Sequence, residues 1–521
     1  MTTSMPLDAL LADLLPARDV PPVLVSGLAL DSREVRPGDL FIALRGSAGH
    51  GLQYVEQARK RGAVAVVAEF ETPDQARAAK PALAFGDSTP NLDLPLILAP
   101  VVRPLIGAMA QRLYGRSALR VVGVTGTNGK TSTVQFIAQA ADRLGLRAAT
   151  QGTLGAGAVG ALLAGERTTP DVCATHRFLA EVAAQHIGLT AMEVSSHALD
   201  QGRVDGVPFE VAVFTQLTRD HLDYHGTMEA YFEAKARLFG WPDLRAAVIN
   251  IDCPYGRQLL PRLASSVRAI TYSASGNAAH LSARSVRLDT RGIAFELQAS
   301  DRGMPRADSG DIAHREGDAT SVYAVQTRLL GKFNVDNLLA AAGTLLALGF
   351  DLADIVQALA ELQPVPGRMN RIAAPNAPTV VVDYAHTPDA IRVAIDALRA
   401  HQPEALSIVF GCGGERDRGK RPLMAQAAAA ANRLYITDDN PRNESGDAIV
   451  ADIVSGLPTH ATATIERDRA RAIRRAIADA AANDMVLIAG KGHEPYQEIA
   501  GRKLPFDDAV VAREALAERA A

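Results

Sequence analysis

The stretch VVGVTGTNGKTS, residues 121–132, decides the fold of this chain. A short run rich in β-branched residues, 120–124, predicts a buried strand, and the amphipathic run 131–143 predicts a helix. Between them, Gly126 and Gly129 let backbone N–H groups approach phosphate oxygens closely, and the helix N-terminus adds partial positive charge. Strand, glycine loop and helix together predict a phosphate-binding loop.

Two side chains at the end of this loop carry the expected chemistry. Lys130 is expected to reach the β- and γ-phosphates of a nucleotide, and the Thr131 hydroxyl is expected to bind Mg²⁺. The common loop pattern has glycine where this chain has Val124, so the prediction rests on the shorter core GTNGKT in its strand-to-helix context. The alternative is an ordinary glycine-rich turn before a helix, which the Lys-Thr pair argues against.

Length and composition exclude several classes of protein. A chain of 521 residues is too long for one ordinary core. Its 54 basic and 58 acidic residues leave a net charge of -4, which gives no support for binding nucleic acid or a membrane surface. Cys173, Cys253 and Cys412 lack metal-ligand spacing, so reduced thiols are expected. No apolar run has the length of a membrane span and the first residues do not resemble a signal peptide, so we expect a cytoplasmic protein without membrane insertion.

The order of predicted elements indicates an α/β protein of three domains. We expect a small N-terminal α/β domain (1–101), a central P-loop domain with a mostly parallel sheet (102–362) and a C-terminal, Rossmann-like doubly wound domain (363–521). A Pro/Gly break at 362–368 marks the second boundary. Within the central domain, alternation over 280–298 predicts a hairpin, and the polar segment 300–321 is expected to be a mobile loop.

Three places in the central domain carry candidate catalytic side chains. Glu193 ends the strand 189–194 and is expected either to hold Mg²⁺ beside the phosphate loop or to act as a helix cap or ion-pair partner. The loop 218–226 has two histidines among its acidic residues, so its chemistry alone indicates a transition-metal or acid–base site. Lys235 follows on the helix 228–240, and its spacing alone marks a solvated lysine on a helix face.

Charged residues follow four predicted strands of the C-terminal domain, whose ligands should gather at the carboxyl ends of the strands. Three of the four strand ends combine Arg, Lys or His with carboxylates, which suits an amino-acid substrate carrying both charges. A dinucleotide site is disfavoured, since no Gly-x-Gly-x-x-Gly pattern opens this domain. The strands are 379–383, 407–410, 434–437 and 485–489.

Nine short strings, in this order, resemble the Mur ligase family of peptidoglycan synthesis, most closely its diaminopimelate-adding members. The resemblance covers nearly the whole chain, and the family's shorter loop pattern removes the departure at Val124. It implies that ATP phosphorylates the free carboxylate of a UDP-linked muramoyl dipeptide, and that the amine of meso-diaminopimelate attacks the acyl phosphate. The strings are Asp31–Arg33, Gly126–Thr131, Met192–His197, Arg219–His225, Gly331–Asn337, Asp383–Pro388, Gly411–Asp417, Asp439–Arg442 and Gly490–Glu494.

The resemblance implies roles for residues at the ATP site. Lys130, Glu193, His221 and Lys235 are expected to be catalytic. Magnesium would be held by Thr131, Glu193, His221 and a carbamylated Lys235. Mg²⁺ thus takes the place of the transition metal that the loop 218–226 alone indicates. The ATP contacts would be Thr125, Gly126, Thr127, Asn128, Gly129, Lys130, Thr131, Asn334, Asn337, Arg368 and Asp383.

The resemblance also implies two further substrate sites. The uracil end of the UDP-linked substrate would contact Leu30, Ser32, Ser47, Ala48 and Gly49, and the rest of it Thr168, Thr169, Ser195, Gln201, Arg203 and Lys235. Arg167 departs from the pattern, because relatives often have Asn there. Diaminopimelate would contact Arg416, Asp439, Asn440, Pro441, Arg442, Gly490 and Glu494, with the forked guanidinium of Arg442 on the distal carboxylate and Glu494 on the distal ammonium.

Three other functions compete with this one. An L-lysine-adding ligase of the same family is disfavoured by Arg442, which would repel the ammonium of lysine. A folylpolyglutamate synthetase is disfavoured by the N-terminal domain that carries Asp31–Arg33. A P-loop regulator that hydrolyses ATP without ligation would need no amine pocket, so the charged strand ends argue against it. We expect a monomer that acts on small molecules.

Overall fold

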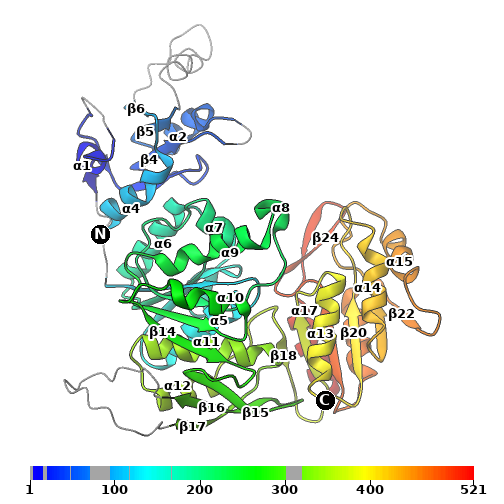
Figure 1. The fold of residues 1–521 in the computed structure, drawn as a ribbon. Coiled ribbons are helices and arrows are strands. Elements are labelled where there is room, and N and C mark those ends of the chain that lie inside the picture. The colour runs from blue at the N-terminus through cyan, green and yellow to red at the C-terminus, as the bar shows by residue number, and fades with distance from the viewer. Residues whose placement is uncertain are drawn as a thin grey trace. The chain divides into compact units, whose positions relative to one another are not determined.

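The computed structural model describes residues 4–15, 20–46, 49–70, 94–115, 118–165, 167–300 and 320–520 (Figure 1). Ser47, Ala48 and most of the segment 300–321 lie outside these residues. The chain forms two compact units, the first made of Met1–Lys130, Ala141–Ile249 and Cys253–Ala269, and the second of Thr131–Ala140, Asn250–Asp252 and Ile270–Ala521. Parallel sheets occur in the N-terminal, central and C-terminal regions, so the predicted α/β fold class is confirmed.

The first unit begins with a small parallel sheet. Its strands lie in the order β3-β4-β5-β6. Both faces are covered, one by a core that includes Leu40 and Ile42, the other by a core that includes Phe41 and Val66. The elements are β1 (Met5–Pro6), α1 (Leu7–Leu11), β2 (Leu24–Val25), β3 (Gly27–Ala29), β4 (Asp39–Ala43), η1 (Gly51–Tyr54), α2 (Val55–Lys60), β5 (Ala65–Glu69), β6 (Leu96–Ala99), η2 (Arg103–Leu105) and α4 (Ile106–Tyr114).

A larger sheet in the first unit carries the phosphate-loop strand at its centre, in the order β10-β9-β8-β11-β7-β12-β13. β8, β11, β7, β12 and β13 are parallel, and their near-continuous apolar runs fit strands that are covered on both faces. The antiparallel hairpin β9–β10 was not predicted. The strands are β7 (Arg120–Thr125), β8 (Ala148–Gly152), β9 (Gly155–Ala158), β10 (Ala161–Leu163), β11 (Leu189–Glu193), β12 (Phe209–Phe214) and β13 (Ala246–Asn250).

The helices of this part follow the strands as expected, with shifted ends. The helix predicted for 228–240 is α-helical only to Ala236 and continues as a 3-10 helix, and the strand predicted for 211–217 ends at Phe214. The helices are α5 (Lys130–Arg143), α6 (Val172–Ala184), α7 (Ser196–Asp200), α8 (Leu222–His225), α9 (Met228–Ala236), η3 (Arg237–Gly240), α10 (Pro254–Leu259) and η4 (Leu260–Arg262).

β14 (Arg268–Ser273), most of which belongs to the second unit, runs parallel to β15 (Leu281–Asp289). β15, β16 (Gly292–Ser300) and β17 (Thr320–Thr327) form an antiparallel meander, which confirms the hairpin predicted over 280–298. Two helices follow, α11 (Phe333–Ala347) and α12 (Leu352–Ala360). The string Gly331–Asn337 thus contains the start of α11, a helix whose side chains are mostly buried.

The C-terminal sheet has the order β18-β19-β23-β20-β21-β22, parallel except for β18. α13, α14 and α15 pack in one core, and α16 and α17 in the other, which confirms the doubly wound arrangement (Figure 1). The hairpin β24–β25 was not predicted. The elements are β18 (Asn370–Ile372), β19 (Thr379–Asp383), α13 (Pro388–Arg399), β20 (Leu406–Phe410), α14 (Lys420–Ala428), β21 (Arg433–Ile436), α15 (Gly446–Val454), β22 (Ala463–Ile465), α16 (Arg469–Ala478), β23 (Met485–Ala489), β24 (Tyr496–Ile499), β25 (Arg502–Pro505) and α17 (Asp508–Ala520).

The three cysteines are free and buried, each in a different core. Cys173 packs with the N-terminal sheet, Cys253 with the central sheet, and Cys412 with the C-terminal sheet. Burial raises the pKa of Cys412 to about 12, and it raises that of Cys173 well above its usual range. None of the three is in a disulfide, as the sequence predicted.

Candidate active site

The predicted phosphate-binding loop connects β7 to α5, which confirms the strand, loop and helix. Gly126 has φ 148°, and a Cβ there would lie 1.9 Å from Oγ1 of Thr215. Thr215 follows β12 and donates a hydrogen bond to the carbonyl oxygen of Asn128 (2.6 Å). Gly129 also has a positive φ, 86°. The loop thus needs glycine where the pattern has it, and the neighbouring strand end fixes its shape.

Two lysines meet at the carbonyl oxygen of Gly126. Lys130 Nζ donates to this oxygen (2.9 Å) and to that of Thr127 (2.8 Å), and Lys235 Nζ donates to it from α9 (2.9 Å). Lys235 is 1% exposed, so the solvated lysine expected from spacing alone was wrong. Burial, and after it the charge of Lys130, hold the pKa of Lys235 well below its usual range.

Tyr231, which the sequence analysis did not single out, also borders the loop. Its hydroxyl shares a hydrogen bond with Oγ1 of Thr127 (3.2 Å), and Lys235 Nζ lies 4.6 Å from the centre of its ring. Burial raises the pKa of Tyr231 to about 12. Only its helical spacing of four residues from Lys235 could have indicated that both side chains reach the loop.

Glu193 ends β11, the strand beside β7, and is 2% exposed. Its carboxylate accepts hydrogen bonds from the N–H (2.8 Å) and the hydroxyl (3.3 Å) of Thr153. These partners, among the described residues, are neutral, so the helix cap and the ion pair that the sequence left open are not what Glu193 forms. A buried carboxylate with neutral partners fits a bound cation, and oxygen is the ligand that Mg²⁺ prefers.

His221 occupies a left-handed conformation, φ 51°, and is exposed. It belongs to a ring cluster in which His197 lies 4.9 Å from His221 and 4.2 Å from Tyr224, centre to centre. In the part of the chain that the structure describes, no three His, Cys, Asp or Glu side chains are placed to hold a metal. The transition-metal site indicated by the loop 218–226 alone is therefore not formed by those side chains.

The threonines predicted to bind the UDP-linked substrate join the Glu193 network. Thr153 and Thr168 share a hydrogen bond between their hydroxyls (3.2 Å), and Thr169 Oγ1 donates to the carbonyl oxygen of Glu193 (2.8 Å). The Ser195 N–H donates to Oγ1 of Thr169 (3.2 Å). Residues that the sequence assigned separately to metal and to substrate thus form one hydrogen-bonded group.

Gln201 and Arg203 extend this group. Arg203 donates to Oε1 of Gln201 from Nε (2.9 Å) and from Nη2 (2.5 Å), and its Nη1 donates to the carbonyl oxygen of Thr169 (3.1 Å). Burial, followed by the charge of Arg167, lowers the pKa of Arg203. Two guanidinium groups therefore lie near Thr169, which suits an anionic substrate.

The residues predicted for the uracil end belong to the part of the first unit that forms the sheet β3-β4-β5-β6. Ser32 is buried, and its hydroxyl donates to Oε1 of Gln57 (2.7 Å). Asp31 pairs with Arg33 two residues away (2.6 Å). Leu30 is half-buried, and Gly49 has φ 152°. The predicted Ser47 and Ala48 lie outside the described residues.

In the second unit, the asparagines predicted for the adenine side form a buried chain. Thr133 Oγ1 donates to Oδ1 of Asn337 (3.3 Å), Asn337 Nδ2 donates to Oδ1 of Asn334 (2.8 Å), and Asn334 Nδ2 donates to the carbonyl oxygen of Leu330 (2.7 Å). Both asparagines are 4% exposed. Since both amide groups have hydrogen-bond partners, these hydrogen bonds fix the orientation of the two asparagine side chains.

Asp336 lies between these asparagines and was missed by the sequence analysis. It accepts a hydrogen bond from Nδ2 of Asn250 (3.3 Å). Burial, and after it the charge of Asp252, raise the pKa of Asp336 to about 6. The sequence around Asp336 gives no sign that a second carboxylate, that of Asp252, lies near it.

Asp383 and Arg368, predicted for ribose and γ-phosphate, lie at the start of the C-terminal domain. The Asp383 carboxylate accepts hydrogen bonds from the N–H groups of Met369 (2.8 Å) and Ala385 (2.9 Å), while burial raises its pKa. The Arg368 guanidinium lies 5.7 Å from the ring centre of Tyr384. The two predicted residues are therefore brought to the same strand end.

The residues predicted for diaminopimelate gather at the ends of β21 and β23. Asn440 Nδ2 donates to Oε2 of Glu494 (3.0 Å), and the fully buried Lys491 donates to Oδ1 of Asn440 (3.1 Å). A Cβ on Gly490 would lie 2.5 Å from Oδ2 of Asp439, so this carboxylate needs the glycine. Burial raises the pKa of Asp439. Lys491 was missed, although it stands inside the Gly490–Glu494 string.

Arg442 has φ 52° and bonds to two neighbouring segments. Its Nη1 donates to the carbonyl oxygen of Gly414 (2.8 Å), and its Nε lies 3.3 Å from Oε2 of Glu498 on β24. Pro441 precedes it, and Arg416 is exposed on the adjoining loop. Glu498 was missed because the hairpin that presents it was not predicted.

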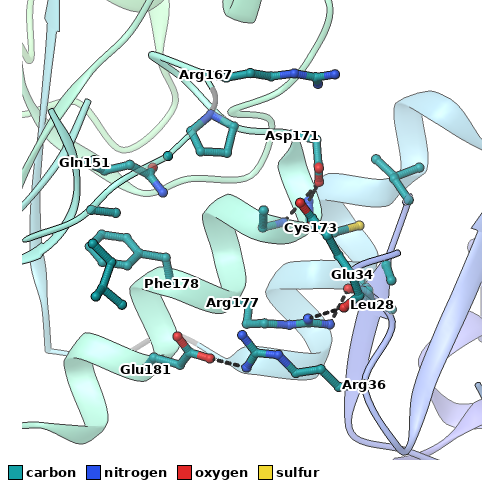
Figure 2. A pocket seen from close by; sticks show the side chains of 18 of the residues that line it. Leu28, Glu34, Arg36, Gln151, Arg167, Asp171, Cys173, Arg177, Phe178 and Glu181 are labelled. Atoms are coloured by element: carbon teal, nitrogen blue, oxygen red, sulfur yellow. Dashed lines mark hydrogen bonds and ion pairs between the residues drawn. The ribbon is translucent and has the colours of Figure 1, made fainter. Parts of the chain in front are cut away.

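A cavity of about 530 Å³ in the first unit is lined by the end of β3, by α6 and by β8 with the hairpin β9–β10 (Figure 2). Two arginines in its wall have partners of their own. Arg177 Nη2 donates to Oδ2 of Asp39 (2.6 Å) and to the carbonyl oxygen of Leu28 (2.7 Å), and Arg36 Nη1 donates to Oε1 of Glu181 (2.5 Å). Leu30 and Arg167 line the same cavity.

A glycine loop between β7 and α5, together with a doubly wound domain that carries charged side chains at its strand ends, is typical of a nucleotide-dependent ligase. Family models match three stretches: Mur ligase family, catalytic domain (24–90), Mur ligase middle domain (124–345) and Mur ligase, glutamate ligase domain (367–492). The chain belongs to the Mur ligase family. It is therefore an ATP-dependent enzyme that forms amide bonds.

Individual relatives match over nearly their whole length. The UDP-N-acetylmuramoyl-L-alanyl-D-glutamate--2,6-diaminopimelate ligase of Xanthomonas oryzae pv. oryzae (strain MAFF 311018) is 51% identical over 526 residues, covering 100% of this chain and 99% of that protein. The protein of the same name from Pseudomonas aeruginosa is 46% identical, covering 95% and 96%. A solved structure of a ligase of that name superposes with a TM-score of 0.71 at 35% identity, covering 99% and 100%.

Among the helices that the structure describes, none combines the length and the apolar character needed to cross a membrane.

Proposed function

We propose that this chain adds meso-diaminopimelate to UDP-N-acetylmuramoyl-L-alanyl-D-glutamate in the synthesis of peptidoglycan precursors, in the bacterial cytoplasm. The observation that carries the proposal is the group of polar and charged side chains at the ends of β21 and β23, where Asn440, Lys491 and Glu494 are hydrogen-bonded to each other. An amino acid with ammonium and carboxylate groups at both ends needs such a mixed set. Relatives about half identical over their full length carry this activity in their names.

The reaction begins with transfer of the γ-phosphoryl group of ATP to the free carboxylate of the dipeptide. Lys130 would move from its loop carbonyls to the β- and γ-phosphates, and the N–H groups of the loop Thr125–Thr131 would hold the phosphate oxygens. The amine of diaminopimelate then attacks the acyl phosphate, and phosphate leaves. The protein contributes chiefly proximity and charge stabilisation.

Magnesium would be held by Thr131, Glu193, His221 and, once carbamylated, Lys235. The buried Glu193 carboxylate, with neutral partners, fits this role. When bound, Mg²⁺ supplies charge neutralisation around the transferred phosphoryl group. Carbamylation would turn Lys235 from a cation into an anion, and its lowered pKa favours the neutral amine that adds CO₂.

The proposal divides the substrates among three domains, 1–101, 102–362 and 363–521. Each of the three stretches matched by the family models falls inside one of these domains. The first domain would hold the uracil end, through Leu30, Ser32 and the loop that ends at Gly49. The central domain would hold the sugar, diphosphate and dipeptide, through Thr168, Thr169, Ser195, Gln201 and Arg203, and the third domain the diaminopimelate. ATP would also contact Asn334, Asn337, Arg368 and Asp383.

Selectivity for diaminopimelate over lysine would come from Arg442. Diaminopimelate differs from lysine by a distal carboxylate, which a guanidinium can bind through two parallel hydrogen bonds. Arg442 is held by Gly414 and Glu498, so its guanidinium has a defined position. Lysine would bring only an ammonium to this position, and two cations would repel each other.

The test is phosphate release with ATP, Mg²⁺ and the UDP-linked dipeptide, comparing meso-diaminopimelate with L-lysine. The wild type should respond to diaminopimelate alone, and Arg442→Ala should lose about 100-fold or more of that response. Arg392→Ala, which removes an exposed arginine from α13, is the control and should behave as the wild type. Equal use of lysine would contradict the selectivity, and no stimulation by either amine would contradict the ligase.

A further inference from the structure

The cavity between β3, α6 and β8 holds a buried amide that the site described above does not use. Gln151 on β8 is 2% exposed and lines the cavity of about 530 Å³. Its side-chain oxygen is buried and has no hydrogen-bond partner among the residues that the structure describes. Leaving such an acceptor unsatisfied is unfavourable, so a buried amide in a cavity wall is a candidate binding group.

The neighbours of Gln151 limit what can bind there. Phe178 of α6 lies on the same side of the cavity in Figure 2, and Ala156 and Leu163 of the hairpin β9–β10 also line it. Two of the arginines in the wall are already held, Arg177 by Asp39 and Leu28 and Arg36 by Glu181. A neutral group that carries a donor, an acceptor and a small apolar part fits this end of the cavity better than a phosphate does.

The position of the cavity indicates which part of the substrate reaches it. Leu30, expected at the uracil end, lines it on one side, while Arg167 and Pro170, which flank the predicted sugar, diphosphate and dipeptide contacts Thr168 and Thr169, line it on the other. Ser32 and Gly49 of the uracil end are not part of its wall. In the covalent order of the substrate, the diphosphate and the acetylated sugar stand between these ends.

We propose that Gln151 binds the acetamido group of the muramoyl sugar, with Oε1 accepting its N–H, and with Phe178 and Ala156 packing on its methyl group. This inference rests on the proposed function, because it takes the UDP-linked substrate as given. Gln151 is then a specificity residue that distinguishes an acetylated from a free amino sugar. The buried, unpartnered Oε1 is an acceptor, and the N–H of an acetamido group is the donor that it would need.

The test compares two substrates and three proteins by steady-state phosphate release at saturating ATP and diaminopimelate. Gln151→Leu keeps the size of the side chain and removes both polar atoms. It should raise the KM for the UDP-linked dipeptide about tenfold or more, with little change in kcat or in the KM for ATP. Gln185→Leu makes the same chemical change at an exposed position next to the end of α6 and should leave all constants unchanged.

The second substrate carries a free amine in place of the acetamido group. The wild type should bind it about tenfold or more weakly, as measured by the KM and by the ligand-induced shift in melting temperature, and Gln151→Leu should lose this discrimination. The wild-type comparison needs no variant, so equal use of both substrates would overturn the inference even where Gln151→Leu fails to fold.

Three outcomes would overturn this inference. They are equal use of both substrates by the wild type, an unchanged KM in Gln151→Leu, and retained discrimination in that variant, and each would mean that water alone satisfies Gln151. Failure of the proposed function is recognised separately, since the wild type would then release no phosphate in response to diaminopimelate with either substrate.

Discussion

Lys235 Nζ donates a hydrogen bond to the carbonyl oxygen of Gly126 across 2.9 Å, which joins α9 to the phosphate-binding loop. Lys130 donates to the same oxygen from the loop itself (2.9 Å). Two amines therefore meet at one carbonyl, with Lys235 buried, where the phosphates of ATP are proposed to bind. This arrangement leads to a first prediction.

Lys235→Met should abolish most of the diaminopimelate-stimulated phosphate release, by about 100-fold or more, while the protein remains folded. Methionine keeps the apolar stem but removes the group that would carry a carbamate near the phosphoryl group. The measurement is the phosphate-release assay, with circular dichroism to follow folding. Lys503→Met removes an exposed lysine and should have no effect, and activity retained in Lys235→Met would contradict the proposed role.

The same lysine should take up CO₂. Its lowered pKa leaves more neutral amine, which is the form that reacts. With ¹³C-labelled bicarbonate we expect one carbamate signal in the NMR spectrum of the wild type and none in Lys235→Met. A signal that persists in the variant would place the carbamate on another amine.

The buried row Thr133–Asn337–Asn334 should contribute to stability as well as to ATP binding. Asn337→Leu would leave the Thr133 hydroxyl and the Asn334 carbonyl group without their partner, at a cost of about 1–3 kcal/mol for each buried group. Urea denaturation should therefore show a lower free energy of unfolding, and the KM for ATP should rise. Asn483→Leu, at an exposed position, is the control. Equal stability of the two variants would contradict this prediction.

Asp336 should make the protein less stable as pH rises from about 4 to about 6. Its pKa is raised from 3.8 to about 6 in the folded state. Below both values the carboxyl group is protonated in the folded and the unfolded state, so it contributes nothing. Above both values it is ionised in each state, and its burial costs up to about 3 kcal/mol.

Asp336→Asn should therefore raise the free energy of unfolding at pH 7–8 by up to about 3 kcal/mol and leave it unchanged near pH 4. The amide oxygen can still accept the hydrogen bond from Asn250. Unfolding in urea at both pH values checks this, with the exposed Asp396→Asn as the control. An equal gain at both pH values would mean that packing, and not charge, is responsible.

The ion pair between Arg469 and Asp508 should be strongly coupled, because both side chains are fully buried. The guanidinium makes two hydrogen bonds of 2.7 Å to the carboxylate. Arg469→Met leaves a buried, unpaired carboxylate and should cost about 3–5 kcal/mol of stability, whereas the double variant with Asp508→Leu should cost less than the sum of the single changes.

An exposed ion pair provides the comparison for these single and double variants. Arg392 and Asp389 lie 2.9 Å apart with side chains 57% and 90% exposed. Arg392→Met should change the free energy of unfolding by less than about 1 kcal/mol. Additive effects at Arg469 and Asp508 would contradict the coupling.

The phosphate-binding loop could be predicted because its signal is local. Gly126, Gly129 and Lys130 stand within a few residues of each other, between a strand and a helix that the local sequence also predicts. The C-terminal sheet could be predicted for a similar reason, since short apolar runs alternate with helical ones. The hairpin β9–β10 was missed because glycine and alanine residues give little strand signal.

Properties that depend on distant neighbours could not be predicted. The burial of Lys235 results from residues more than a hundred positions earlier in the chain, which helical spacing does not contain. The unpaired amide of Gln151 belongs to no sequence pattern, and its surroundings come from α6 and from the missed hairpin. Glu498 beside Arg442 escaped notice in the same way, because it stands on the missed hairpin β24–β25.

Because Cys173, Cys253 and Cys412 are each buried in a different core, the chain contains a natural reporter for each region. A thiol-reactive reagent can modify a cysteine only after its surroundings open, so the labelling rate of each thiol follows the opening of its own core. Mass spectrometry of the labelled peptides would separate the three rates without any introduced probe. The order in which the regions open could thus be measured on the unmodified enzyme, with and without its substrates.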